Sequence, residues 1–199
     1  MLRYDNTADD DLDYVRRVMA KVERMFGPGR RVFVGFSIGA QFGLIALNRT
    51  PRLFTDFVSA SGTCIGTEGV TRADVSLVQF YGEEDERFPW EGGFSNNRLT
   101  RFLERRLPLL DPRAANSDPH SLERGFAEAN GYSRRPVEKL VAGGIAYRKQ
   151  YNPPGAKPIV VSYYVCGPGL GGHTYQGPAA PEVFSVNERF VAELGLMPA

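Results

Sequence analysis

The stretch RVFVGFSIGAQFGLIAL, residues 31–47, decides how this chain is organised. After Arg31 it opens with a short apolar run rich in Val and Phe, which predicts a buried strand. A helical pattern follows from residue 38 to about residue 48. Between the two, Gly35, Ser37 and Gly39 form the pattern G-x-S-x-G, which is typical of a nucleophile elbow when a strand precedes it and a helix follows. The flanks meet this condition, so Ser37 is a candidate nucleophile rather than part of an ordinary turn.

The spacing within this motif has a physical reason. We expect Ser37 to adopt a strained backbone conformation that holds its hydroxyl clear of the sheet edge. The chain would then double back so tightly that a side chain at position 35 or at position 39 would clash, which explains both glycines. A helix that begins directly after the serine also aims backbone N–H groups, starting with that of Ile38, at an oxyanion developing on a substrate.

The composition is that of a soluble globular protein and predicts one domain over residues 1–199. A formal net charge of +1 argues against a nucleic-acid partner. No apolar run is long enough to cross a bilayer, and the first residues lack the apolar segment of a signal peptide. We therefore expect a cytoplasmic protein, or a secreted one if the N-terminus is truncated. The two cysteines, Cys64 and Cys166, are too few for a disulfide framework or a structural zinc site, and either one bridge or two free thiols fits them.

Strand patterns alternate with helical patterns along the rest of the chain. This alternation indicates the α/β class, with a mainly parallel sheet flanked by helices. A polar, helical insertion is expected over about residues 94–150. The other predicted elements are a helix over 9–26, strands over 53–61, 75–81 and 158–165, and a helix over 187–194. In such sheets the ligand crevice lies beyond the carboxyl ends of the strands. Ser37, Asp85 and His173 each follow a predicted strand, so we expect them to gather at one rim.

A serine hydroxyl needs an adjacent base, and the base needs an acid that orients it. His120 and His173 are the two histidines of the chain. We expect His120, in a polar segment, to be a surface residue. His173 lies in a glycine-rich loop after the last strand, which can bring its imidazole over the serine.

The orienting acid is expected in the loop before the strand that leads to His173. Asp85 is the best candidate there, with Glu83 and Glu84 as competitors. Its carboxylate would accept a hydrogen bond from one imidazole nitrogen and stabilise the imidazolium. The order serine, acid, histidine is the one that α/β-hydrolases use.

Taken together, these segments resemble the esterase group of the α/β-hydrolase superfamily that includes polyhydroxybutyrate depolymerases and feruloyl esterases. The resemblance rests on residues 31–40, 54–62, 81–93, 127–132 and 171–177. Tyr81-Gly82 stands where His-Gly is usual, and Tyr132 replaces a family cysteine. The earlier strands of the family, with their His-Gly oxyanion loop, have no counterpart before residue 9. We therefore expect an N-terminally shortened fold, which leaves the Ile38 N–H as the one implied oxyanion donor. A second copy in a homo-oligomer, another chain or a rearranged segment would then cover an exposed apolar sheet edge.

The resemblance implies a serine ester hydrolase that acts through an acyl-enzyme on a polyhydroxyalkanoate-type or hydroxycinnamoyl ester. Ser37 would attack, His173 would carry the proton and Asp85 would orient His173. Trp90 would either line the acyl pocket or serve in packing. No metal and no cofactor is implied. A non-catalytic hydrolase-like domain that binds a ligand or partner, and a serine peptidase of the same fold, remain as alternatives.

Overall fold

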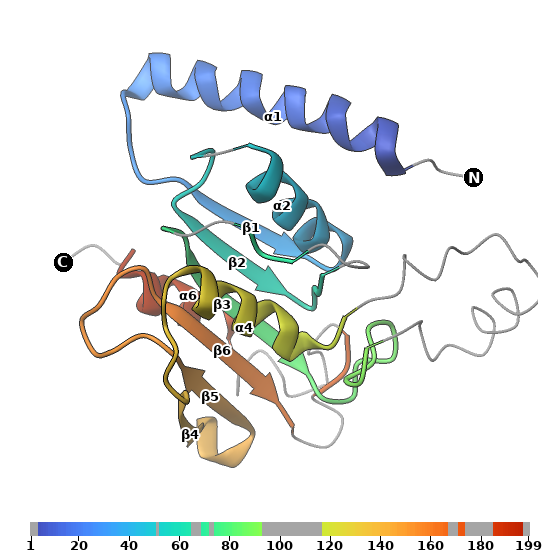
Figure 1. Ribbon diagram of the computed structural model, residues 1–199, viewed down its shortest axis with the longest axis vertical. Coiled ribbons are helices and arrows are strands. Elements are labelled where there is room, and N and C mark those ends of the chain that lie inside the picture. The colour runs from blue at the N-terminus through green and yellow to red at the C-terminus, as the bar shows by residue number, and fades with distance from the viewer. Residues whose placement is uncertain are drawn as a thin grey trace, which may run out of the picture.

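The computed structural model describes residues 4–50, 52–64, 69–71, 74–92, 117–166, 171–173 and 185–196 (Figure 1). Helices and strands alternate through most of this part of the chain. In chain order they are α1 (Tyr4–Phe26), β1 (Val32–Phe36), α2 (Ile38–Arg49), β2 (Asp56–Ala60), β3 (Ser76–Gly82), α4 (Pro119–Ala129), β4 (Val137–Val141), the 3₁₀ turn η2 (Ala142–Gly144), β5 (Ala146–Gln150), β6 (Val160–Val165) and α6 (Val186–Leu194).

The strands form one mixed sheet with the order β1-β2-β3-β6-β5-β4. Strands β1, β2, β3 and β6 are parallel to one another, whereas β5 and β4 add to the sheet in antiparallel pairs. The predicted α/β class is therefore confirmed. Because the four parallel strands all end at the same edge, the loops after them lie close together.

Strands β2, β3 and β6 are buried on both faces, which explains why they appear in the sequence as continuous apolar runs, whereas β1 at the edge of the sheet is partly exposed and is not the buried strand that its apolar run predicted. Successive side chains of a strand point to opposite faces. Phe57 and Leu77 join a hydrophobic cluster with residues of α1, α2 and α4, and Val58 and Val78 join a second cluster with residues of α6. Figure 1 shows the same layering, with α2 and α4 in front of the sheet and α6 behind it.

The sequence predicted that residues 137–150 belong to a helical insertion. In the structure they instead form the hairpin of β4 and β5. Gly143 and Gly144 have φ values of 67° and 91°, and this backbone conformation favours glycine and allows the tight connection. Strand β5 then pairs with β6, from Ala146 opposite Val165 to Gln150 opposite Val161. A free edge of the central sheet thus decides the conformation of a segment whose own pattern was ambiguous.

Most other element boundaries agree with the sequence to within about three residues. Helix α1 begins at Tyr4, five residues before the predicted start at residue 9. The part of the predicted insertion between residues 93 and 116, including a helix expected near residues 99–107, lies outside the described residues.

Candidate active site

The turn between β1 and α2 has the strained geometry expected for it. Ser37 has φ 55° and ψ −124°, a region that a residue with a side chain rarely adopts. Its N–H donates to the carbonyl of Ala60, at the end of β2, over 2.8 Å. This bond extends the sheet pairing to the serine itself and holds the strained residue at the sheet rim.

Only one of the two motif glycines is required by space. A Cβ atom on Gly35 would lie 2.6 Å from the Cα and 2.7 Å from the N of Ala40, so a side chain there would collide with the backbone of α2. A Cβ on Gly39 would meet nothing within 4 Å. The expectation that both positions would clash is therefore wrong for Gly39, because this residue lies in the first turn of α2 with its Cβ direction open.

Three side chains predicted from the sequence meet at this rim. The Nε2 atom of His173 lies 2.9 Å from the Oγ of Ser37. The other ring nitrogen, Nδ1, lies 2.8 Å from Oδ2 and 3.0 Å from Oδ1 of Asp85. A continuous hydrogen-bonded chain thus runs from a hydroxyl through an imidazole to a carboxylate.

The Asp85 carboxylate is held from its own loop as well as by the histidine. Its Oδ1 accepts the backbone N–H groups of Arg87 and Phe88, each over 2.9 Å. The residue is 3% exposed, whereas the competing acids Glu83 and Glu84 are exposed. The acid that contacts His173 is therefore Asp85.

The loops that carry Asp85 and His173 are bonded to each other. Glu84 N–H donates to the carbonyl of Gly171 over 2.9 Å. A Cβ atom on Gly82 would lie 1.9 Å from that same carbonyl oxygen, so glycine is required where the two backbones meet. This close approach fixes the distance between the acid and the imidazole.

Two features around His173 were missed by the sequence reasoning. The Oγ of Ser61 donates to the backbone carbonyl of His173 over 2.6 Å and anchors the loop from the end of β2. The rings of Phe36 and Phe88 each lie 5.2 Å from the imidazole, measured between centroids. Ser61 directly follows a strand of the parallel sheet, as Ser37 does. This position at the carboxyl end of a strand could have identified it from the sequence as a residue of the same rim. The two phenylalanines restrict water around the imidazole and so strengthen its hydrogen bonds.

Ile38 is the first residue of α2 and directly follows Ser37. Backbone N–H groups in the first turn of a helix have no acceptor within the helix, and they carry the positive end of the helix dipole. The side chain of Ile38 is largely exposed. Its N–H is thus a suitable donor to an oxyanion formed next to Ser37.

Trp90 packs against other aromatic rings rather than against the Ser37 hydroxyl or the His173 imidazole. Its ring packs at centroid distances of 6.0 Å from Tyr81, 4.8 Å from His120 and 5.1 Å from Tyr164. The hydroxyl of Tyr81 donates to the carbonyl of Phe88, so this aromatic group braces the loop that carries Asp85. These contacts support the expectation that Trp90 serves in packing. They do not support the alternative that Trp90 lines an acyl pocket.

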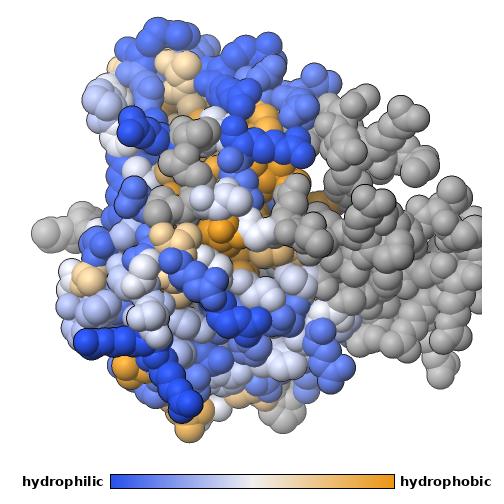
Figure 2. All heavy atoms as spheres, viewed as in Figure 1, coloured by the Kyte–Doolittle hydropathy of each residue, from blue (hydrophilic) through white to orange (hydrophobic). Residues whose placement is uncertain are grey.

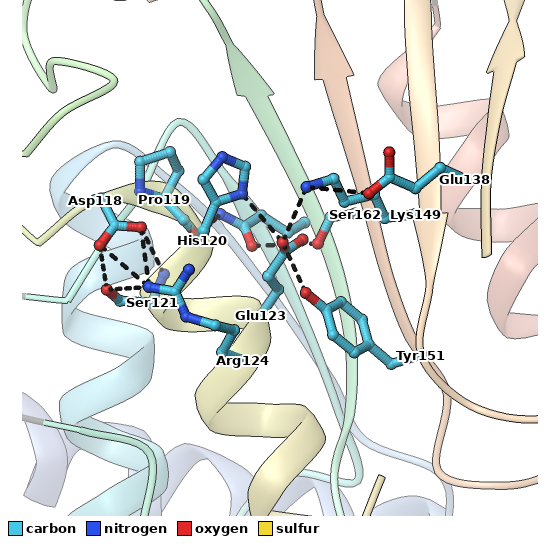
Figure 3. Close-up of polar contacts among 11 residues, drawn as sticks. Asp118, Pro119, His120, Ser121, Glu123, Arg124, Glu138, Lys149, Tyr151 and Ser162 are labelled. Carbon is cyan, nitrogen blue, oxygen red and sulfur yellow. Dashed lines mark hydrogen bonds and ion pairs between the residues drawn. The ribbon is translucent and has the colours of Figure 1, made fainter. Parts of the chain in front are cut away.

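His120 is half-buried rather than a surface residue, because it takes part in a polar cluster around Glu123 (Figure 3). The Oε1 atom of Glu123 accepts the hydroxyl of Tyr151 over 2.9 Å, and it lies 3.1 Å from His120 Nδ1 and 3.6 Å from the Nζ of Lys149. Burial alone would raise the pKa of the Glu123 carboxyl, but His120 and Lys149 lower it below its ordinary value. The cluster joins α4 to β5 through a buried carboxylate.

The remaining expectations concern metals, thiols and membranes. Within the described residues, no three His, Cys, Asp or Glu side chains are grouped so that they could hold a metal ion. Cys64 and Cys166 are not joined by a disulfide bridge. Among the helices of the described part of the chain, none combines the length and the apolar character that crossing a membrane requires.

Comparison of the chain with protein-family models, with curated proteins and with solved structures finds no significant match. What the site does must therefore be argued from its own residues.

Proposed function

We propose that this protein is a serine ester hydrolase with an α/β-hydrolase type of fold. The observation that carries the proposal is the chain of hydrogen bonds from Ser37 through His173 to Asp85, which begins at a serine in a strained turn. A serine with an ordinary structural role does not need a positive φ, a histidine partner and a buried acid behind that histidine.

Ser37, His173 and Asp85 would carry out the reaction as two acyl transfers, the first from the substrate to Ser37 and the second from Ser37 to water. His173 Nε2 accepts the hydroxyl proton as Ser37 Oγ attacks the acyl carbon, and Asp85 stabilises the resulting imidazolium through Nδ1–H. The Ile38 N–H donates to the tetrahedral oxyanion. His173 then protonates the departing alcohol oxygen, which leaves an acyl ester on Ser37. Water attacks this ester with His173 as base, and the carboxylic acid is released as Ser37 regains its proton.

The substrate class rests on the resemblance of residues 31–40, 81–93 and 171–177 to polyhydroxybutyrate depolymerases and feruloyl esterases. We propose a polyhydroxyalkanoate-type or hydroxycinnamoyl ester on this ground. The wild-type protein can be assayed with hydroxybutyrate oligomers, with methyl ferulate and with a peptide amide of matched size. Hydrolysis of the amide alone would favour the peptidase alternative.

The deciding experiment is labelling with a fluorescent organophosphonate, combined with turnover of a short-chain nitrophenyl ester. We expect one label per chain in the wild-type protein, and a loss of both label and turnover in Ser37→Ala. Ser185→Ala is the matched control, because Ser185 caps α6 through the N–H of Glu188 and takes no part in the hydrogen-bonded chain from Ser37 to Asp85. A folded wild-type protein that neither reacts nor turns over the ester would instead be a non-catalytic binding domain.

A further inference from the structure

The open edge of β1 presents unpaired backbone groups. In the described part of the chain, β1 pairs with β2 alone. The carbonyl of Arg31 accepts from Asp56 and the N–H of Ser37 donates to Ala60, so the odd-numbered residues of β1 are bonded to β2. Because bonding alternates along a parallel strand, the N–H and C=O groups of Val32, Val34 and Phe36 face away from the sheet. Three residues thus form a template for a further strand.

This edge lacks the features with which proteins usually protect a free strand. Such edges carry charges, prolines or bulges, but β1 has the sequence VFVGF. Val34 is 54% exposed and Phe36 is 48% exposed. For comparison, strand β4 at the opposite edge of the sheet carries Glu138 and Lys139. The chemistry of β1 is that of a strand inside a sheet.

Helix α1 covers one face of the space beside β1. A groove of about 550 Å³ lies between the two elements. It is lined by Val15, Met19, Val22 and Phe26 of α1 and by Val32, Phe33 and Val34 of β1, among others. Val22 and Phe26 are 41% and 77% exposed, so α1 turns apolar side chains towards an incompletely filled space. Figure 2 shows hydrophobic residues exposed below the largely hydrophilic top of the molecule, where Figure 1 places α1 and α2.

The width of the groove indicates what can occupy it. Helix α2 packs on β1 and β2. Packed helices lie about 8–10 Å apart and neighbouring strands about 4.8 Å apart, so α1 covers about two strand positions beyond β1. A second copy paired through β1 would bring its own α2 over these positions, where α1 already lies. The occupant must therefore be extended and carry no helix on this face.

One buried polar atom also faces an incomplete environment. Arg31 lines the groove, and its Nη1 donates to Glu23 over 2.5 Å. Its Nε is buried without a hydrogen-bond partner. The Arg31–Glu23 pair therefore forms a polar border of an otherwise largely apolar groove.

From these observations we propose that β1 and α1 together bind an extended segment of another polypeptide as an additional strand, with apolar residues at alternate positions. Main-chain bonds to Val32, Val34 and Phe36 supply affinity, and the apolar side chains fill the space under α1. The proposal is independent of ester hydrolysis and is tested by binding.

The probe is a fluorescent, capped peptide of about seven alternating Val and Thr residues, the length of an ordinary strand. We expect saturable binding to the full chain by fluorescence anisotropy. The same peptide with alternate amides N-methylated keeps its side chains but cannot pair, and it should bind at least about tenfold more weakly. Amide hydrogen exchange at Val34 and Phe36 should be fast in the free protein and slow in the complex.

Two variants locate the binding edge. Val34→Lys should weaken binding at least about tenfold, because it places a charge under the docked strand. Val137→Lys is the matched control, since Val137 is also an exposed valine on an edge strand, β4, and it should change binding less than twofold. Thermal unfolding checks that both variants fold.

Four results of the binding and exchange experiments would overturn the proposal. They are the absence of saturable binding, equal affinity for the N-methylated peptide, equal weakening by the two lysine variants, and protection of Val34 and Phe36 amides in the free monomer. The last would mean that the chain covers its own edge. Sedimentation that shows a dimer, dissolved by Val34→Lys, would assign the edge to a second copy and would equally exclude the proposed occupant.

Discussion

Ser37 and Gly35 act as a pair at the scale of single residues. The positive φ of Ser37 brings the first turn of α2 against β1, and the absence of a Cβ on Gly35 leaves room for the backbone of Ala40. The strained backbone at Ser37 is therefore supported by a glycine two residues earlier, rather than by glycines on both sides.

The different requirement for glycine at positions 35 and 39 can be tested with an alanine substitution at each position. Gly35→Ala forces a Cβ into the backbone of α2 and should destabilise the fold by about 1–3 kcal/mol or more, with loss of organophosphonate labelling. Gly39→Ala meets open space and should leave stability within about 1 kcal/mol. Chemical denaturation of both variants measures the difference. Equal destabilisation would show that the turn does not have the geometry described.

Asp85 is predicted to act by orienting His173, not by exchanging protons with the substrate. Asp85→Asn keeps the size of the side chain but presents an amide to Nδ1, which favours the wrong imidazole tautomer. We expect kcat for a nitrophenyl ester to fall by about 10⁴, with a much smaller change in KM. Glu84→Gln, an exposed neighbour, is the control and should retain activity. An Asp85→Asn variant with nearly normal kcat would remove Asp85 from the mechanism.

Ser61 acts through the backbone of His173, so its effect should be smaller. Ser61→Ala removes the donor to the His173 carbonyl and loosens the loop that carries the imidazole. We expect kcat to fall about tenfold with KM little changed, because a misplaced base weakens transition-state stabilisation more than binding. Ser61→Cys keeps a small side chain with a weak S–H donor and should lose less activity than Ser61→Ala. A parallel fall in stability without a change in kcat would indicate a purely structural role.

At the scale of elements, an ion pair ties the start of the sheet to the last helix. Arg30 donates to both carboxylate oxygens of Asp56, over 2.6 and 2.7 Å, and also to the carbonyl of Leu194 at the end of α6. Burial alone would raise the pKa of the Asp56 carboxyl, but hydrogen bonds from Arg30 and Thr55 lower it below its ordinary value. The carboxylate form is thus the one that the fold stabilises.

Asp56→Asn should therefore destabilise the protein by about 1–3 kcal/mol, since it leaves Arg30 without its charged partner. The loss of stability stays moderate because the Arg30 side chain is 37% exposed and water partly solvates it. Asp13→Asn, in the exposed Arg16–Asp13 pair on α1, is the control and should change stability by less than about 0.5 kcal/mol. Denaturant midpoints report both values. Similar effects in the two variants would mean that burial does not strengthen the Asp56 pair.

At the scale of the whole molecule, two buried carboxylates and one half-buried one, that of Glu193, form ion pairs that support the packing of the sheet. Asp56 contacts Arg30, Glu123 contacts His120 and Lys149, and Glu193 contacts Arg148 over 2.6 Å. The pKa of each carboxyl lies below its ordinary value, although burial opposes this in every case. Each therefore binds a proton more weakly in the folded state than in the unfolded chain.

The sign of the pH dependence follows from these lowered pKa values. The stability that the carboxylates contribute is fully present above their unfolded pKa values, 3.8 for Asp and 4.5 for Glu, and is lost as the pH falls through the lower folded values. We expect the thermal midpoint to fall by about 5–10 °C from about pH 6 to about pH 3. Glu193→Gln should reduce this dependence. A midpoint independent of pH in this range would contradict the assigned contacts.

The sequence by itself determined the elements whose local pattern is strong. The apolar runs around Val34, Val58, Val78 and Val161 specify strands, of which all but the first, in the edge strand β1, are buried, and G-x-S-x-G between a strand and a helix specifies the turn at Ser37. The same order of elements also indicated that Ser37, Asp85 and His173 share one rim, because parallel strands end at the same edge. These predictions needed only periodicity, turn chemistry and chain order.

The tertiary structure alone decided what depends on contacts between distant segments. The hairpin at residues 137–150 forms because β5 pairs with the edge of β6, and neither strand encodes this pairing locally. The roles of Ser61 and Phe88 at His173, and the packing of Trp90 against His120, likewise arise where separate loops meet. The local sequence pattern indicates which face of a helix or strand is apolar. Which other element packs on that face depends on the fold of the whole chain.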